Sequence, residues 1–507
     1  MKLSQLLIPV TGSVIHGDDT VDISGVTCDS RSVSPGCLFF ALRGASADGH
    51  RFIPAAIAAG ASAIVLENQE DAPSDIPWVR VTDGRAAMAR MAAEFYGNPT
   101  AGVPLIGITG TNGKTTTTYL IEAILAATGL PAAVLGTISY RFENVCLESS
   151  HTTPESTELQ AAFRKLADTG AKSFVMEVSS HALEQKRVDG CQFDVGIFSN
   201  LTRDHLDYHV NMERYRAAKS RLFSELLRPD ATKPRRRAVI NRDDPSGEAI
   251  QKLSACPVIT FGIDFRGDVY PMDIRISVNG ISGSIRTPAG DFPFASNLLG
   301  RFNLSNILAA VSAGIALDLP LEAIKYGIEH HATVPGRMQR VENRHGITLL
   351  VDYAHTGDAL ENVLSTIKEL ATGRIITVVG CGGDRDPGKR PIMGRIAAEW
   401  SDLTIVTSDN PRSEDPLAIL GQIKAGVQTL NTKEFRHDEL ADGFDAKGFI
   451  VRENRREAIR LAVRSARTGD IILLAGKGHE NYQIIGTTRH HFDDCEEAAQ
   501  ALAEIAT

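Results

Sequence analysis

The feature that most constrains the fold is a glycine-rich turn between a strand pattern and a helix pattern. The apolar run PLIGIT at 104–109 predicts a buried strand, and an amphipathic helix pattern covers 119–128. Between them, GITGTNGKTT spans residues 107–116. Glycines let backbone N–H groups point inward, and a helix N-terminus adds the positive end of a dipole, so such a turn can hold phosphates. The sequence therefore predicts a nucleotide-binding loop.

Two side chains make this loop more specific. Lys114 can reach the β- and γ-phosphates of ATP, and the Thr115 hydroxyl can ligate Mg²⁺. The usual spacing G-x-x-x-x-G-K-[ST] requires glycine at 108, where this chain has Ile108, so the match is to a shorter variant. The alternative, a plain tight turn, leaves the lysine and its threonine neighbours unexplained. The residues expected to bind ATP are Gly110, Thr111, Asn112, Gly113, Lys114, Thr115 and Thr116.

The order of strand and helix patterns predicts an α/β protein of three domains. A chain of 507 residues is too long for one ordinary core. Residues 1–98 hold short strand runs and helix patterns at 54–60 and 85–96, and form a small N-terminal α/β domain. Strands alternate with helices over 99–333 and 334–507, which predicts mostly parallel sheets covered on both faces. We expect a central P-loop-type domain and a C-terminal Rossmann-like domain, with an antiparallel edge at 264–295.

Composition excludes several classes of protein. A net charge of −9 argues against a general nucleic-acid surface, and the basic run 233–237 is interpreted as a solvated loop. No apolar run approaches the roughly 20 residues that span a bilayer, and the N-terminus has no signal-peptide pattern. Seven scattered cysteines without a CxxC pair indicate neither a disulfide framework nor a zinc site. We expect a cytoplasmic monomer with no membrane span.

A carboxylate and a histidine follow strand patterns of the central domain. Glu177 ends SFVMEV, and His205 lies in NLTRDHLD after FDVGIFS. Side chains at the carboxyl ends of parallel strands reach the ligand crevice, and Mg²⁺ prefers carboxylate, water and phosphate oxygens. We expect Glu177 and Thr115 to serve the ATP metal, with His205 near a second Mg²⁺. The alternatives are a loop anchor for Glu177 and an ordinary hydrogen-bonded role for His205.

Ten motifs then occur in order along the chain. They are GTNGKTT, EVSSHAL, NLTRDHLDYH, AAKSRLF, NLLGRFNLSN, VPGRMQ, DYAHT, GCGGDRD, DNPR and GKGHE. The series resembles the Mur ligases, and within them the members that add meso-diaminopimelate. The resemblance covers essentially the whole chain, and several motifs are specific to this family. One departure is Gly357, where relatives usually have proline, which could loosen that turn.

The resemblance implies a reaction. ATP, meso-diaminopimelate and UDP-N-acetylmuramoyl-L-Ala-D-Glu would be the substrates of a ligase in peptidoglycan biosynthesis. The γ-carboxylate of D-Glu would become an acyl phosphate, and the amine at the L-centre of diaminopimelate would displace phosphate. The base for that amine stays open among His205, Glu177 and direct proton loss to water. Domain closure is expected, because ATP binds the central domain and the amino acid the third.

The resemblance also implies a modified lysine. Lys219 would be carbamylated (N6-carboxylysine), and its carbamate would ligate the second of two Mg²⁺ ions with His205. Only a neutral amine reacts with CO₂, so burial or nearby positive charge should depress the Lys219 pKa. Without the resemblance, Lys219 would be interpreted as a surface helix lysine. The catalytic residues are then Lys114, Glu177, His205 and Lys219.

Further contacts follow from the same motifs. Asn303 and Arg337 resemble adenosine- and phosphate-side contacts and Asp352 a ribose contact, while a helix cap is the alternative for Asn303. In the N-terminal domain, VTCDSR and the segment 44–49 resemble walls of a uridine-diphosphate-sugar site. The residues implied to bind the UDP-muramoyl peptide are Cys28, Ser30, Thr152, Thr153, Ser179, Gln185 and Arg187.

Three loops of the C-terminal domain follow strands and carry charges, so they can converge on one crevice. Diaminopimelate differs from lysine by a distal carboxylate, which the planar fork of arginine can pair with. A lysine substrate would leave such an arginine unpaired, giving a discrimination on the order of 10² or more. An alternative is that Arg412 only braces its proline turn through Glu414 and Asp415. The implied diaminopimelate contacts are Arg385, Asp409, Asn410, Pro411, Arg412, Gly476 and Glu480.

Two competing functions stay open at this point. A sister ligase, from another Mur step or a folylpolyglutamate-type synthetase, would share the ATP motifs but not DNPR with Arg385. A switch or transport ATPase would hydrolyse ATP without an amino acid, but its typical loop spacing is absent here.

Overall fold

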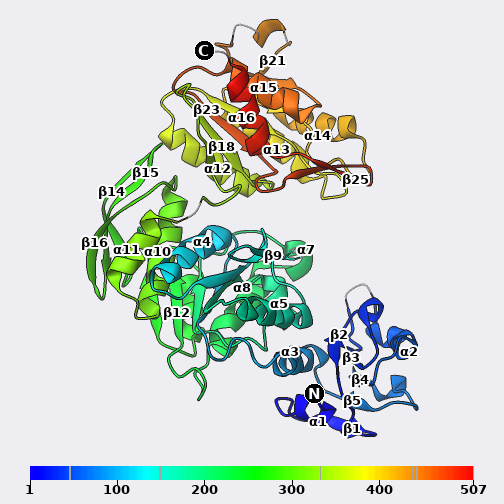
Figure 1. Cartoon of the computed structure of the whole chain (residues 1–507). Coiled ribbons are helices and arrows are strands. Elements are labelled where there is room, and N and C mark those ends of the chain that lie inside the picture. The colour runs from blue at the N-terminus through cyan, green and yellow to red at the C-terminus, as the bar shows by residue number, and fades with distance from the viewer. Residues whose placement is uncertain (45–46, 148–150, 332, 437, 441–442, 506–507) are drawn as a thin grey trace. The chain divides into compact units, whose positions relative to one another are not determined.

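The computed structural model describes residues 1–44, 47–147, 151–331, 333–436, 438–440 and 443–505 (Figure 1). The chain folds into two compact units. The first comprises residues 1–273, 283–294 and 305–331, and the second comprises 274–282, 295–304 and 332–507. No helix in the described part of the chain is both long enough and apolar enough to cross a bilayer.

The first unit begins with a small α/β sheet of order β1-β5-β4-β3-β2. Four strands run parallel and β1 pairs antiparallel with β5. Buried apolar runs form its centre, as the strand patterns predict. The strands are β1 (Val14–His16), β2 (Gly25–Thr27), β3 (Cys37–Phe40), β4 (Ala63–Leu66) and β5 (Trp78–Arg80), with helices α1 (Leu3–Leu6), α2 (Ile53–Ala58) and α3 (Gly84–Phe95).

The same unit contains an eight-stranded sheet of order β13-β12-β11-β6-β10-β7-β8-β9, with six strands parallel and β8 and β9 antiparallel. Its strands are β6 (Leu105–Thr109), β7 (Ala132–Leu135), β8 (Tyr140–Phe142), β9 (Val145–Leu147), β10 (Ser173–Glu177), β11 (Val195–Phe198), β12 (Arg237–Asn241) and β13 (Val258–Phe261). Its helices are α4 (Lys114–Ala127), α5 (Ser156–Asp168), α6 (Ser180–Glu184), α7 (Leu206–His209), α8 (Met212–Arg221), α9 (Gly247–Leu253) and α11 (Leu321–Glu329). Helix α10 (Arg301–Ala316) belongs to this unit from Ser305 onward, and its first turn belongs to the second unit.

Helices cover both faces of this sheet, as expected. Phe174 and Met176 of β10 share a buried cluster with Leu159 and Phe163 of α5. Successive strand residues point to opposite faces, so Glu177 lies on the other face, where its carboxylate accepts a hydrogen bond from Thr115 of α4. The phosphate loop therefore follows a central strand, at the carboxyl edge of the sheet.

The second unit contains a seven-stranded sheet of order β17-β18-β23-β19-β20-β22-β21, parallel except for the edge strand β17. Its strands are β17 (Gln339–Val341), β18 (Thr348–Asp352), β19 (Ile375–Val379), β20 (Leu403–Val406), β21 (Lys433–Glu434), β22 (Gly448–Val451) and β23 (Ile471–Ala475). Helices α12 (Gly357–Leu370), α13 (Lys389–Trp400) and α14 (Pro416–Gln428) share one core with it, and α15 (Arg455–Ser465) and α16 (Asp494–Glu504) share another. A hairpin, β24 (Tyr482–Ile485) with β25 (Thr488–His491), follows β23.

The segment expected to form an antiparallel edge instead forms its own sheet. Strands β14 (Tyr270–Ser277), β15 (Gly280–Thr287) and β16 (Gly290–Ser296) pair in that order and join no larger sheet. Two-residue turns connect them, which is the hairpin arrangement.

The basic run at 233–237 is not the solvated loop that its composition suggests. Lys233 is 6% exposed and pairs with Asp194 at 2.6 Å. Arg236 is 5% exposed and pairs with Asp230 at 2.5 Å. That interpretation is wrong for these two residues, because each cation finds an acid partner that brings it into the fold.

Candidate active site

The phosphate loop spans Gly110–Gly113, between the end of β6 and the start of α4. Gly110 has φ 151° and Gly113 has φ 89°, a region where side-chain-bearing residues are strained. A Cβ at Gly110 would lie 1.9 Å from Ser199 Oγ, and one at Gly113 would lie 2.2 Å from Asn306 Oδ1. Both positions therefore require glycine for space as well as for backbone conformation.

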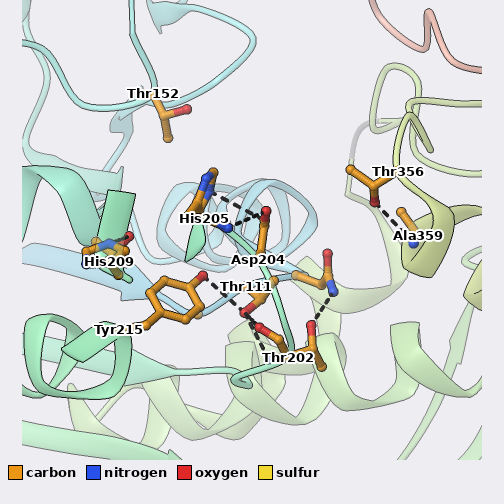
Figure 2. A network of polar contacts seen from close by, with 12 residues as sticks. Thr111, Thr152, Thr202, Asp204, His205, His209, Tyr215, Thr356 and Ala359 are labelled. Atoms are coloured by element: carbon orange, nitrogen blue, oxygen red, sulfur yellow. Dashed lines mark hydrogen bonds and ion pairs between the residues drawn. The ribbon is translucent and has the colours of Figure 1, made fainter. Parts of the chain in front are cut away.

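The loop is held by the segment that follows β11. The Asn112 amide donates to Asn200 Oδ1 at 2.8 Å, and Ser199 Oγ donates to the Asn112 carbonyl at 2.7 Å. The Thr111 hydroxyl lies 3.2 Å from both Tyr215 Oη and the Thr202 carbonyl oxygen (Figure 2). These contacts fix the backbone of the loop before any nucleotide is present.

Two lysines donate to one carbonyl oxygen of this loop. Lys114 Nζ lies 3.0 Å from Gly110 O, and Lys219 Nζ lies 2.9 Å from the same atom. Lys219 is 1% exposed, with Nζ 4.5 Å from the centroid of the Tyr215 ring. Burial, and then the charge of Lys114, hold the pKa of Lys219 well below its ordinary value. The surface-lysine interpretation is thus wrong, and a neutral amine of the kind that reacts with CO₂ is favoured.

Glu177 is buried beside the first turn of α4. It is 1% exposed and accepts hydrogen bonds from Thr115 Oγ1 at 2.9 Å and from the amide and hydroxyl of Thr137, each at 3.0 Å. No cluster of three or more His, Cys, Asp or Glu side chains suited to a metal occurs in the described ranges. The donor set of Glu177 and Thr115 nevertheless fits Mg²⁺, which uses one or two protein oxygens together with waters and phosphate oxygens.

His205 and Lys219 both lie near the ring of Tyr215. His205 precedes α7 with φ 53°, and its Nε2 is 3.4 Å from Asp204 Oδ2 (Figure 2). Its ring centroid is 5.0 Å from that of His181 and 6.1 Å from that of Tyr215, the ring that Lys219 also contacts. The structure thus brings the two residues of the predicted second metal site to the same tyrosine.

Three of the residues expected to contact the muramoyl peptide lie around Glu177: Thr152, Thr153 and Ser179. Thr152 Oγ1 is 3.0 Å from Thr137 Oγ1, the hydroxyl that also donates to Glu177. Thr153 Oγ1 donates to the Glu177 carbonyl at 2.9 Å and accepts from the Ser179 amide at 3.1 Å. Residues from separate loops therefore converge on Glu177, the carboxylate predicted to serve the ATP metal.

Arg187 is engaged by the protein itself. Its guanidinium donates to Gln185 Oε1 and the Thr153 carbonyl, each at 2.8 Å, and lies 3.0 Å from Glu155. Gln185 in turn donates to Tyr208 Oη at 3.0 Å. These bonds indicate that Arg187 organises the loop at Thr153, a role the sequence did not suggest.

The N-terminal candidates follow β2. Ser30 opens a short turn capped by Asp29, and the exposed Arg31 pairs with Asp29 at 2.8 Å. Burial, and then the nearby Glu155, raise the pKa of Cys28 to about 11, so its thiol stays neutral. Of the second wall expected at 44–49, residues 45–46 lie outside the described residues.

Of the nucleotide-side candidates of the second unit, Asn303 and Asp352 are buried and Arg337 is half-buried. Asn303 lies inside the first turn of α10 and donates to the Leu299 carbonyl at 2.8 Å, so its interpretation as the helix cap is wrong. Asp352 ends β18 and accepts from the Met338 and Ala354 amides at 2.7 and 2.8 Å. Burial raises the pKa of Asp352. The Arg337 guanidinium carbon lies 5.1 Å from the centroid of the Tyr353 ring, directly after Asp352.

A charged cluster occupies the ends of β20 and β23. Lys477 is completely buried and pairs with Asp409 at 3.2 Å and with Glu480 at 3.7 Å. Asn410 Nδ2 donates to Glu480 Oε2 at 2.8 Å. Burial, and then the charge of Asp409, raise the pKa of Glu480. The sequence pattern indicated Asp409 and Glu480 but not Lys477. The position of Lys477 in GKGHE, between Gly476 and Glu480, is the signal that could have identified it.

Arg412 does not pair with the local acids. Its Nη1 donates to the Gly383 carbonyl at 2.6 Å. Glu414 instead binds Arg390 through two bonds of 2.8 Å, and Asp415 caps α14. The alternative role of Arg412 as a brace through those acids is therefore wrong. Arg385 is exposed and donates to the Asp384 carbonyl at 3.1 Å. It lies on the loop whose Gly383 carbonyl accepts a hydrogen bond from Arg412, but its exposure leaves its side chain less fixed than that of Arg412.

Gly113 offers a direct test of the loop geometry. G113A is expected to raise the KM for ATP at least about tenfold, because the new Cβ displaces Asn306 and a positive φ costs about 1–2 kcal/mol. The matched control is G129A at the other end of α4, where φ is 74° and the added Cβ meets no atom within 4 Å. Thermal unfolding and ATP kinetics check both. Equal effects on KM would show that backbone strain alone matters.

His479 provides a pH test within the second unit. Burial, then the charge of Arg337, lower the pKa of His479 from 6.5 to about 4. The folded state thus favours the neutral ring, so this stability is complete above pH 6.5 and is lost as the pH falls toward 4. Between pH 7.5 and pH 4.5, the free energy of unfolding of the unmodified protein should fall by about 2 kcal/mol more than that of H479Q. If denaturant titrations show the same acid-induced loss of stability in both proteins, groups other than His479 cause it.

The two units together meet the requirements of an enzyme that joins a carboxyl group to an amine at the expense of ATP. One supplies a phosphate loop with lysines and a metal-type carboxylate. The other presents acids and an arginine after β20 and β23, the strands on either side of β19, a charge set that suits an amino acid.

Comparison with known proteins identifies the family. Family models match residues 22–96 (Mur ligase family, catalytic domain), 108–314 (Mur ligase middle domain) and 336–478 (Mur ligase, glutamate ligase domain). The chain belongs to the Mur ligase family. It is an ATP-dependent, amide-bond-forming ligase, which excludes a switch or transport ATPase.

Relatives match over the full length. A protein of Geobacter metallireducens, named UDP-N-acetylmuramoyl-L-alanyl-D-glutamate--2,6-diaminopimelate ligase, is 60% identical over 100% of this chain and 99% of its own. The protein of that name from Geobacter sulfurreducens is 58% identical over 99% of each chain. A solved structure of a ligase with the same name has a TM-score of 0.71 at 33% identity, covering 100% of both chains.

Proposed function

We propose that this ligase adds meso-diaminopimelate to the γ-carboxylate of D-Glu in UDP-N-acetylmuramoyl-L-Ala-D-Glu during peptidoglycan biosynthesis. The observation that carries this proposal is the charge set at the ends of β20 and β23. Arg412 can pair with a carboxylate, and Asp409 with Glu480 can receive an ammonium group. Such a set suits a carbon that bears both groups, as the distal centre of diaminopimelate does. The activity named for the full-length relatives supports the same substrate.

In the first chemical step, the D-Glu γ-carboxylate attacks the γ-phosphorus of ATP, giving an acyl phosphate and ADP. The amides of the Gly110–Gly113 loop and Lys114 hold the transferred phosphoryl group, because phosphoryl transfer depends on positioning and charge stabilisation. Thr115 and Glu177 would hold one Mg²⁺, and His205 with the Lys219 carbamate a second. When bound, these ions neutralise charge that develops on the phosphate oxygens.

In the second step, the amine at the L-centre of diaminopimelate attacks the acyl carbon. A C–N bond forms, phosphate leaves with the C–O bonding pair, and the amine releases a proton. His205, Glu177 and water are the acceptors to be distinguished. Thr152, Thr153 and Ser179 lie around Glu177 and are proposed to position the peptide carboxylate.

The remaining proposed contacts follow the same division. The path of the UDP-muramoyl peptide would be lined by Cys28, Ser30, Gln185 and Arg187. The adenosine side of ATP would be contacted by Asn303, Arg337 and Asp352. We place the enzyme in the cytoplasm as a monomer. All seven cysteines are free, in agreement with a reducing compartment.

Product mass gives the decisive test. The enzyme is incubated with ATP, UDP-muramoyl dipeptide and equal amounts of diaminopimelate and lysine. The expected product carries diaminopimelate, in excess over lysine by a factor on the order of 10². Predominant lysine incorporation would overturn the substrate assignment, and amino-acid-dependent ADP release only with D-Ala-D-Ala would indicate a sister ligase.

A further inference from the structure

A fully buried ion pair lies behind the charged cluster of the second unit. Arg455, the first residue of α15, donates from Nε and Nη2 to the two carboxylate oxygens of Asp494 in α16, at 2.7 and 2.6 Å. Neither side chain has exposed surface. Replacing such a pair with packed apolar residues is often neutral or stabilising. Fold stability alone therefore gives little reason for two buried charges at this position.

The same guanidinium reaches the loop that carries Glu480. Arg455 Nη2 also donates to the Ala475 carbonyl at 3.2 Å. Ala475 ends β23, and the chain turns at once through Gly476, which has φ 112°. Arg455 thus holds the backbone at the point where the strand gives way to the Gly476–Glu480 loop.

The charges of this region are coupled. Burial opposes the charged form of Arg455, but Asp494, and to a smaller extent Asp409 and Glu480, more than offset it and raise the pKa of Arg455. Arg455 and Lys477 set two positive charges against the three carboxylates, so one negative charge is left when all are ionised. A single ammonium would balance it. Replacing Arg455 and Asp494 together leaves this balance unchanged, so such a variant tests the position of the loop and not its charge.

We propose that Arg455, held by Asp494, is a positioning residue for the amino-acid substrate: it fixes the Gly476–Glu480 loop through the Ala475 carbonyl and so holds Glu480 where it can meet the distal ammonium group. This inference rests on the proposed function. Different residues then serve the two charged groups on the distal carbon of diaminopimelate. Arg412 recognises the carboxylate, and Arg455 acts on the ammonium group by holding the loop that carries Glu480.

The test uses two substrate analogues in the full-length enzyme. L-2-Aminopimelate lacks only the distal amino group, and lysine lacks only the distal carboxylate. The variant R455M/D494L removes both buried charges together, so no uncompensated ion is left in the core. The matched control is R456M/E497L. Arg456 and Glu497 also join α15 to α16, with two bonds of 2.6 Å, and neither has a recorded bond to Ala475.

The expected result is a change in one selectivity ratio. R455M/D494L should lower the preference for diaminopimelate over 2-aminopimelate, in kcat/KM, by about tenfold, as for loss of a charge-assisted contact. Its preference for diaminopimelate over lysine and its KM for ATP should change less than about threefold. R456M/E497L should keep the preference for diaminopimelate over both analogues.

Two outcomes would refute the inference. An unchanged 2-aminopimelate ratio, or equal losses in the two paired variants, would reduce Arg455 to a structural residue. If R455M/D494L does not fold, R455K gives the same test, since lysine keeps the charge but not the two-nitrogen geometry, and about a threefold loss is expected. An unmodified enzyme that incorporates no diaminopimelate would refute the proposed function, whereas an active one with an unchanged ratio refutes this inference alone.

Discussion

K219R is expected to lower kcat by a factor on the order of 10³, the scale of losing a metal-held charge stabiliser at the transferred phosphoryl group. Arginine can still donate a hydrogen bond to the Gly110 carbonyl, as Lys219 does, but cannot form a carbamate. If the ammonium itself were the functional group, K219R would keep most of its activity. ADP release in the presence of all three substrates measures the difference.

K219E serves as the contrasting variant. Its carboxylate imitates the carbamate charge with a shorter side chain, so K219E should be more active than K219R and K219A. Isotope-labelled bicarbonate, followed by carbon NMR, should give a carbamate signal in the unmodified enzyme and none in these variants. The reverse activity order, with no carbamate signal from the unmodified enzyme, would remove Lys219 from the metal site.

R412A is expected to raise the KM for diaminopimelate on the order of 10²-fold while leaving the KM for ATP within about threefold. The guanidinium is half-buried and oriented by Gly383, and the nearby Glu414 is committed to Arg390, so Arg412 is available to a substrate carboxylate. R412K should recover part of the loss, because an ammonium cannot make the two parallel bonds. Steady-state kinetics with each substrate varied separately provides the measurement.

R385A is the internal comparison for this arginine pair. Arg385 is exposed, and its recorded bond is to the neighbouring Asp384 carbonyl, so its loss should raise the same KM by only about three- to tenfold. Equal increases in the KM for ATP and for diaminopimelate in R412A would point to a folding defect. Larger effects in R385A than in R412A would exchange the two roles.

Much of the fold followed from local patterns. The glycines at 110 and 113 mark a turn between an apolar strand and a helix, and the strands on either side read as continuous buried runs. Because parallel strands end at one edge, residues such as Glu177 and Asp409 could be assigned to crevices from strand boundaries alone.

Burial of charged residues could not be predicted in this way. Helix α8 is mostly polar, so Lys219 resembles a surface residue until the Gly110 loop, 109 residues earlier, packs onto it. Lys477 becomes an interior cation only because Asp409, 68 residues earlier, lies beside it. The same holds for Lys233 and Asp194. The burial of each lysine depends on contacts with residues far away in the sequence, which a local hydrophobic pattern does not predict.

The carbonyl oxygen shared by Lys114 and Lys219 has a consequence for how CO₂ would act on this enzyme. A carbamate is an anion that accepts hydrogen bonds through its oxygens, so loading Lys219 replaces the neutral amine beside Lys114 with a negative group. Lys114 then no longer shares the Gly110 carbonyl with a second donor, and its ammonium can turn toward an incoming triphosphate. Dissolved carbon dioxide would in that way prime the nucleotide cradle as well as complete the metal site.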